Sequence, residues 1–404
     1  MPRLSGTVLL VALCGASVAQ GGAREIEAGV EDFWYRTAET ALNRDNFLGL
    51  DKNENLLRGA LSWKETRGAA KFVFKGFVER SSGADAKTTW TARQAYAQYG
   101  WGPGVQVRVG RQRLGWGSGF AWNPTNRLEP PKNPANTALE QEGSLAARLD
   151  IVPANWAGVI LVAARGETGL GNLPFSGSAS ERNTGALRVR FLVKNTDLAF
   201  VVSGGERQPT LLGLDLGRDL GGVSIHAEAA TYQGSEIAPP RPEQRFFRLA
   251  TGLLWSRDTT SVTAEYFFNG EGYSDGATKT YLRSLDATYA AATNPVLPRA
   301  AQQAALARYG ALAALPFSGG LGLRRHYLQA SWTRSEIRGQ WTTALRSVVG
   351  LSDGGVALTP GVVYAPRGDF TISLDGVILL GPGDSEYRLA PLRGALQARV
   401  KALF

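Results

Sequence analysis

A glycine- and tryptophan-rich segment, residues 110–126, is the first place where residue types and spacing suggest chemistry. Gly115, Gly117 and Gly119 have the spacing of a phosphate-binding loop and follow a strand-like segment. Such a loop also needs a helix after it, because the helix N-terminus supplies N–H groups to the phosphate. Prolines, which exclude a regular helix, follow instead at Pro124, Pro130, Pro131 and Pro134. Glycines beside tryptophans therefore predict a sharply bent chain that packs against a wall.

Catalysis and metal binding have few candidate residues. The two histidines, His226 and His326, have no recognisable nucleophile or metal-binding pattern beside them. Polar residues alternate over 51–55 like the start of a calcium loop, but Leu56 stands where that loop needs glycine. The sequence therefore predicts no enzyme, no metal site and no cofactor.

The first 19 residues have the features of a secretory signal peptide. Arg3 supplies a positive charge, residues 7–13 are apolar, and small residues precede the expected cleavage point after Ala19. The exported chain is then residues 20–404, and it loses Cys14, the one cysteine. Disulfides and thiolate metal sites are excluded from it.

The dominant pattern beyond the signal peptide is alternation of apolar and polar residues in short segments bounded by Gly, Asn, Asp or Pro. No stretch there is apolar for long enough to cross a bilayer as a helix. The alternation predicts about 18 strands. Their expected ranges are 24–36, 54–64, 70–80, 88–99, 104–112, 143–152, 157–165, 185–194, 196–204, 209–217, 221–231, 244–256, 259–269, 322–334, 337–349, 355–365, 369–380 and 392–404.

The connections between these strands alternate in length. Short turns follow the even-numbered strands, whereas the connections at 37–53, 113–142, 166–184, 232–243 and 270–321 are long. Short periplasmic turns and long outer loops are typical of bacterial outer-membrane barrels. The predicted fold class is all-β: a single transmembrane antiparallel β-barrel over residues 20–404.

Large aromatic residues lie near the strand ends that the short turns join. A soluble β-sandwich would instead bury its aromatic residues between two sheets, whereas a membrane barrel carries aromatic girdles at its interfaces. The residues concerned are Trp63, Tyr99, Trp255, Trp332, Tyr364 and Phe404, with Phe72 and Phe370 at the start of returning strands.

The last strand ends the chain on Phe404. Apolar residues from Leu396 to Phe404 alternate with Gln397, Arg399 and Lys401. An alternating strand that ends in phenylalanine resembles the terminal signal read by the barrel assembly machinery of the outer membrane. The resemblance implies that Phe404 is an assembly signal, that this machinery is a partner, and that the barrel lies in outer-membrane lipid.

The segment 110–126 also carries a family resemblance. Gly-Arg-Gln, then Trp-Gly, then Trp-Asn-Pro-Thr-Asn, all after a strand, resembles a signature of bacterial outer-membrane barrels, including porin-like and alginate-export-like proteins. The resemblance implies a loop folded toward the lumen and passage of a solute. The expected constriction-loop residues are Arg111, Arg113, Trp116, Phe120 and Trp122.

The charge, +9 with a pI near 9.7, comes from arginines scattered singly along the strands. No basic run or nucleic-acid motif occurs, so we expect no nucleic-acid partner. A charge is costly on a lipid face, so the strand arginines should line the pore, where they attract anions. Alternatively they pair with acids and only fill the lumen. The predicted pore-lining residues are Arg108, Arg148, Arg188, Arg190, Arg338, Arg346, Arg399 and Lys401.

Three functions agree with these observations. The first is a porin-like outer-membrane channel for passive passage of small polar or anionic solutes. The others are an export conduit for an acidic polysaccharide and a non-conducting surface barrel that acts as an anchor or adhesin. An alanine-rich stretch, residues 298–309, predicts a short helix that caps the pore, plugs it, or only decorates the surface. A homo-oligomer is compatible with the sequence.

Overall fold

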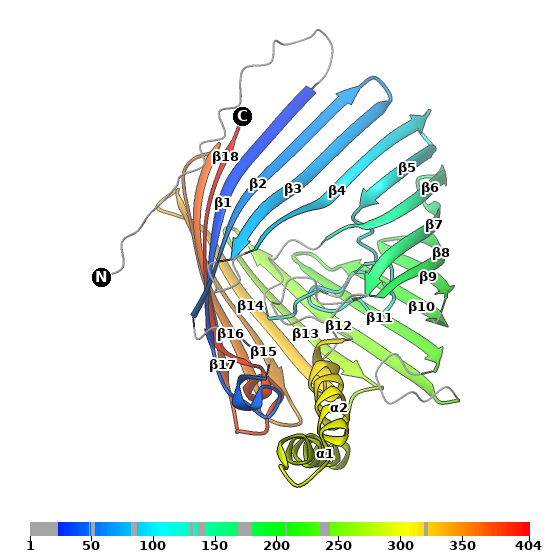
Figure 1. Ribbon diagram of the computed structural model, residues 1–404. Helices are drawn as coiled ribbons and strands as arrows, with labels where there is room; N and C mark the ends of the chain where they lie inside the picture. Colours follow the sequence, from blue (N-terminus) through cyan, green and yellow to red (C-terminus); the bar gives the residue numbers. More distant parts are fainter. Residues whose placement is uncertain are drawn as a thin grey trace.

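The structure is a computed structural model that describes residues 23–404 except 48, 50–52, 82–86, 130–131, 136–141, 169–179, 207, 235–242 and 319–321. The predicted signal peptide and its cleavage point lie outside the described residues. The described strands form one 18-stranded sheet, and β1 pairs with β18 as well as with β2. The sheet therefore closes into a barrel (Figure 1), as predicted.

The strands are paired antiparallel with their sequence neighbours around the whole barrel. Their bounds are β1 Ala23–Thr37, β2 Asn53–Arg67, β3 Ala70–Ser81, β4 Thr88–Trp101, β5 Val105–Gln112, β6 Ser144–Ala154, β7 Ala157–Thr168, β8 Ser180–Val193, β9 Thr196–Gly205, β10 Gln208–Asp219, β11 Val223–Gln233, β12 Arg245–Arg257, β13 Thr260–Asn269, β14 His326–Ile337, β15 Trp341–Gly350, β16 Val356–Arg367, β17 Phe370–Leu380 and β18 Leu392–Leu403.

Each predicted strand is found, with one correction that affects a predicted site residue. The expected turn at 335–336 lies further along the chain, because β14 continues to Ile337 and β15 begins at Trp341. Arg338 therefore lies in the turn, with φ 52, beside Gly339 with φ 74. Glycine tolerates such positive φ angles, so the turn forms around it. The predicted place of Arg338 on a strand face is wrong.

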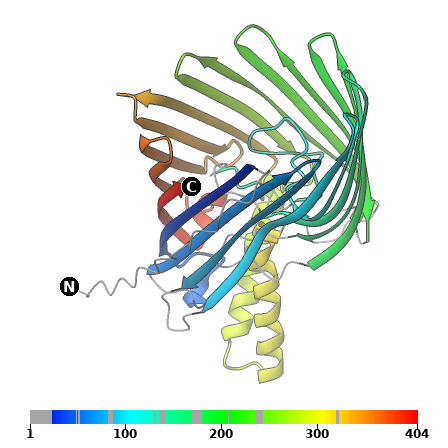
Figure 2. The same cartoon turned by 90° about the horizontal axis from the view of Figure 1, so that it is seen from above.

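The predicted alternation of connections is confirmed. Turns of two or three residues join the strands at one end of the barrel, here called the short-turn end, at 68–69, 102–104, 155–156, 194–195, 220–222, 258–259, 338–340 and 368–369. The other strand ends, which the remaining connections join, form the opposite end, here called the long-loop end. Two helices, drawn in yellow, extend away from the strands there (Figure 2). The backbone groups of Phe404 and Ile26 exchange hydrogen bonds of 2.7 and 3.2 Å, which close the seam between β18 and β1 at the short-turn end.

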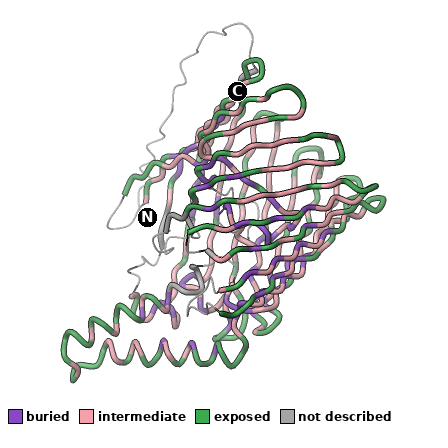
Figure 3. The backbone as a smooth tube through the Cα atoms, turned by 90° about the vertical axis from the view of Figure 1, so that its right-hand side faces the viewer, coloured by how far each residue is buried: buried purple, intermediate pink, exposed green. Residues whose placement is uncertain are grey.

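The two faces of the wall differ in chemistry. Along β11, His226, Glu228 and Ala230 are buried and alternate with more exposed residues. Colours of different burial alternate along other strands of the wall as well (Figure 3). Large hydrophobic side chains such as Val30 and Leu161 are exposed on the outer face, as a lipid environment requires. Of the predicted girdle, the most exposed members at the short-turn end are Tyr99, Trp255, Trp332 and Phe404, with Phe72 beside them.

Two long helices project from the long-loop end (Figure 1). The predicted helix is α2, Arg299–Ser318, and it is longer than expected. A second helix, α1, Asp275–Thr293, was not predicted; Ser274 caps it by accepting a hydrogen bond from Ala277 N, and Tyr281 and Leu285 form its buried face. None of the described helices is long and apolar enough to cross a membrane.

The helix pair packs on other connections of the long-loop end. Its buried side chains, including Tyr309, contact Leu42 in the β1–β2 connection and Leu389 of α3, Glu386–Leu389. A 3-10 turn, Arg44–Asn46, lies in the β1–β2 connection. These contacts fix the helix pair to the rim of the barrel, and its role as a cap, a plug or a surface decoration stays a prediction.

Candidate functional site

The connection between β5 and β6, residues 113–143 and here called the lumen loop, packs against the inner wall. Leu114, Trp116 and Leu128 contact buried residues of the wall from β6 to β12. Trp122 and Ala135 contact a second buried group on β12 to β16. The inward fold implied by the family resemblance is therefore present (Figure 1).

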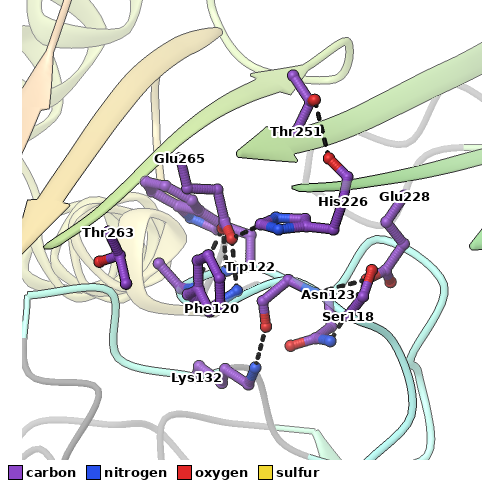
Figure 4. A network of polar contacts seen from close by, with 12 residues as sticks. Ser118, Phe120, Trp122, Asn123, Lys132, His226, Glu228, Thr251, Thr263 and Glu265 are labelled. Carbon is purple, nitrogen blue, oxygen red and sulfur yellow. Dashed lines mark hydrogen bonds and ion pairs between the residues drawn. The ribbon is translucent and has the colours of Figure 1, made fainter. Parts of the chain in front are cut away.

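Glu265, on β13, binds consecutive backbone N–H groups of the lumen loop (Figure 4). Its carboxylate accepts hydrogen bonds from Phe120 N, from Ala121 N at 3.1 Å and from Trp122 N at 2.9 Å. His226 Nε2 lies 3.0 Å from the same carboxylate. Glu265 is fully buried, and a buried carboxylate is stable only when hydrogen-bonded in this way. The loop backbone provides those bonds.

Glu228, on β11, binds the lumen loop at Gly119 and Thr125, on either side of the residues that Glu265 binds. Its carboxylate accepts hydrogen bonds from Thr125 N at 2.8 Å, from Thr125 Oγ1 at 2.7 Å and from Gly119 N at 3.3 Å. Gly117 and Gly119 are required because a larger residue at either position would clash in this packing. A Cβ atom on Gly117 would lie 2.4 Å from Glu228 Oε2, and one on Gly119 would lie 1.9 Å from the Trp122 carbonyl oxygen. The predicted close packing of the glycines is thus explained.

Asp215, on β10, completes the set of wall carboxylates. It accepts hydrogen bonds from Ser118 Oγ at 2.5 Å and Ser118 N at 3.3 Å, and Arg188 Nη2 lies 3.0 Å away. Asp215, Glu228 and Glu265 together are called the anchor carboxylates below. They fix residues 118–125 of the loop at three points on the wall.

Aromatic rings and a lysine also hold the lumen loop. Trp122 stacks on Phe267 with ring centroids 4.9 Å apart, and Phe120 meets His226 edge-on at 4.6 Å. Lys132 Nζ donates to Gly119 O at 2.6 Å. Burial lowers the pKa of the Lys132 ammonium, against the raising effect of Glu265 and Glu228.

A polar cavity of about 350 Å³ lies on the short-turn side of the lumen loop. The loop supplies Ser118 and Phe120 to it, and the wall supplies Arg188, Asp215 and His226. The bent loop therefore narrows one side of the lumen and leaves solvent-sized space beneath it.

The other predicted loop residues also hold the loop in place. Arg111 Nη1 donates to Gly143 O at 3.0 Å, and Arg113 Nε lies 3.0 Å from Glu129 Oε1. Trp116 is buried against the wall. The structure thus brings all five predicted constriction-loop residues into or beside the lumen loop.

Most of the predicted pore-lining cations are paired with a carboxylate on the wall. Only Arg108 and the turn residue Arg338 have no such partner among the described residues. The pairs are Arg148–Asp150 at 2.7 Å, Arg188–Asp215 at 3.0 Å, Arg190–Asp197 at 2.5 Å, Arg346–Asp375 at 3.5 Å, Arg399–Glu31 at 3.1 Å and Lys401–Glu27 at 2.9 Å.

Arg108 lies in a row of polar residues across four strands. Register pairs join Lys71 to Gln98, Gln98 to Arg108, and Arg108 to Arg148. Arg108 Nε donates to Gln98 Oε1 at 3.2 Å, and its guanidinium lies 4.9 Å from the ring centroid of Tyr96. This set, Lys71, Gln98, Arg108 and Arg148, is called the basic row.

The anchor carboxylates were not predicted as site residues. One signal was available for Glu228 and Glu265: each is an isolated acid on an otherwise uncharged stretch of its strand. Their partners are backbone N–H groups more than 100 residues away, and such pairings leave no local pattern. Within the described residues, no group of three or more His, Cys, Asp or Glu could hold a metal ion.

Solved structures with a similar fold include the outer-membrane protein OprD of Pseudomonas aeruginosa, with a TM-score of 0.52 and 8% identity over 94% of this chain and 93% of that chain. Acinetobacter baumannii OccAB2 matches with a TM-score of 0.55 and 8% identity over 94% of this chain and 98% of that chain. Pseudomonas aeruginosa OccK5 gives 0.54 and 9%, over 94% and 98%. Pseudomonas aeruginosa OccK2, solved in complex with glucuronate, gives 0.52 and 8%, over 95% and 96%. No protein family and no curated protein matches the sequence.

Proposed function

We propose that the chain is an outer-membrane channel for passive passage of small polar or anionic solutes. The observation that carries the proposal is a closed barrel whose inner wall is polar and whose lumen loop is pinned to one side of it. Such a loop narrows an 18-stranded lumen without filling it. The fold of OccK2, which was solved with the anionic sugar glucuronate, supports the same proposal.

We assign the anion preference to the basic row. Lys71 and Arg108 form no ion pair with a carboxylate among the described residues, and Arg148 carries the one carboxylate partner of the row, Asp150. Guanidinium groups bind carboxylates bidentately, so the row would attract a carboxylate-bearing solute. The other predicted cations, apart from Arg338 in its turn, are paired with carboxylates, so we expect the preference to be moderate.

Planar-bilayer recording tests the proposal. The purified chain should give steady single-channel conductance, and a salt gradient should give a reversal potential that indicates anion selectivity. A chain that inserts fully but never conducts would refute the channel. Conductance without anion selectivity would agree with the channel proposal but refute the role of the basic row.

The alternatives have no specific observation in their favour. The alginate-export-like part of the resemblance, which suggested an acidic-polysaccharide conduit, is not supported by the matched structures. A non-conducting anchor would give zero conductance in the same recording. Outer-membrane location, recognition of Phe404 by the assembly machinery and homo-oligomer formation remain proposals of the same kind.

A further inference from the structure

Three arginines converge at the long-loop end of the barrel seam, where β18 meets β1. Arg36 is the second-last residue of β1, Arg393 is the second residue of β18, and Arg388 belongs to α3 just before β18. The register between the two strands breaks after Arg36, which pairs with Gly394, whereas Thr37 pairs with Leu392. Arg393 is therefore the extra residue of a bulge that faces the end of β1.

The segment that carries Arg388 is fixed to the chain that follows β1. Thr40 Oγ1 donates to Leu389 O at 2.8 Å, and Ala38 N donates to Pro391 O at 3.1 Å. These bonds hold α3 against residues 38–40, next to Arg36 in the chain. These hydrogen bonds to backbone carbonyl groups, and no described salt bridge of the three arginines, bring the segments that carry them together.

No acid balances these charges within the described part of the chain. The side chains of Arg36, Arg388 and Arg393 form no hydrogen bond or ion pair with described residues. Glu39, the nearest acid to Arg36 along the chain, also forms none. Glu386, the nearest acid to Arg388, binds Leu323 N and the Tyr327 hydroxyl group instead. The positive charges of Arg388 and Arg36 act on Arg393, and no carboxylate is among its electrostatic neighbours. Arg388 Nε is buried without a partner. The lumen arginines, in contrast, are mostly paired with carboxylates.

The arginines lie at the edge of the apolar outer face. Trp34, on the outer face of β1, is 40% exposed, and Arg36 follows on the same face. Leu396, which pairs with Trp34 across the seam, is also 40% exposed. Interfacial tryptophan marks the boundary between lipid chains and headgroups. The arginines therefore lie at headgroup level.

We propose that Arg36, Arg388 and Arg393 form a binding site for a phosphate group. Guanidinium groups bind phosphate through paired N–H donors, and a phosphate group would supply the negative charge that the cluster lacks. Because of its position, the site can take the phosphate from a membrane lipid or from solution.

The test is titration calorimetry of the folded full chain in micelles of a neutral maltoside detergent, with inorganic phosphate and with phosphatidic acid as separate probes. Diacylglycerol of the same chain length is the uncharged lipid control. The test variant is the double substitution Arg36→Gln, Arg388→Gln. The matched control is Arg80→Gln, Arg245→Gln, because both of these exposed arginines lie near the long-loop end on other strands and have no described partner.

We expect the wild type and the control variant to bind at least one phosphate probe, and the test variant to bind it at least about tenfold more weakly, equivalent to about 1.4 kcal/mol. Binding of phosphatidic acid alone would identify a lipid headgroup as the source, and binding of inorganic phosphate would identify a site open to solvent. The proposal is overturned if the wild type binds neither probe, or if the test variant binds as tightly as the control. Heat-modifiable mobility on gels verifies that each variant is folded.

Discussion

Glu265→Gln tests how the lumen loop is held. The carboxylate accepts hydrogen bonds from three consecutive backbone N–H groups, those of Phe120, Ala121 and Trp122. A glutamine keeps one oxygen and presents an NH₂ group where the other stood, so at least one backbone N–H then meets a donor. The shape of the side chain hardly changes, so the barrel itself should fold normally.

The expected change in the free energy of loop opening follows from the loss of the negative charge on Glu265. Hydrogen bonds to a charged acceptor contribute about 1 kcal/mol more than neutral ones, so three weakened bonds cost about 3 kcal/mol. The free energy of local loop opening should fall by that amount, which raises the open population roughly a hundredfold. Asp150→Asn is the matched control, because it removes one negative charge from the inner wall but pairs with Arg148 and not with the loop.

Hydrogen exchange of the amides of residues 119–123 measures this opening directly, and single-channel recording measures its effect on the pore. In Glu265→Gln the amides should exchange much faster and the open-channel current should become noisy. Both quantities should be nearly unchanged in Asp150→Asn. Exchange in Glu265→Gln as slow as in the wild type would refute the anchoring role of Glu265.

Three further predictions follow from the same contacts. Gly119→Ala should displace the lumen loop and change the conductance, because the new Cβ would lie 1.9 Å from the Trp122 carbonyl oxygen; an unchanged conductance would contradict the packing. Arg108→Gln should shift the reversal potential toward cations more than Arg346→Gln does, because Arg346 is paired with a carboxylate 3.5 Å away; equal shifts would argue against the basic row. Deletion of Phe404 should lower the yield of folded barrel on gels, because it removes the two hydrogen bonds that close the short-turn end of the seam; a normal yield would refute its assembly role.

Strand positions could be predicted because a barrel strand has one apolar and one polar face, and this alternation is written locally in the sequence. The same holds for the short turns and for Phe404 at the end of the last strand. The ends of β14 and β15 could not be predicted as well, because a turn at Glu336 or at Gly339 leaves the alternation almost equally satisfied. Arg338 was assigned to a strand for that reason.

The sequence by itself determined the barrel and its strand order, and the family resemblance of the segment rich in glycine and tryptophan implied its inward fold. Only the tertiary structure decided which charges remain unpaired. In the sequence, Arg188 and Arg346 look the same as Arg108. Unlike Arg108, they have carboxylate partners, Asp215 and Asp375, on strands that do not follow directly in the chain. Charge pairing across a barrel depends on register and on side-chain reach, which no single strand encodes.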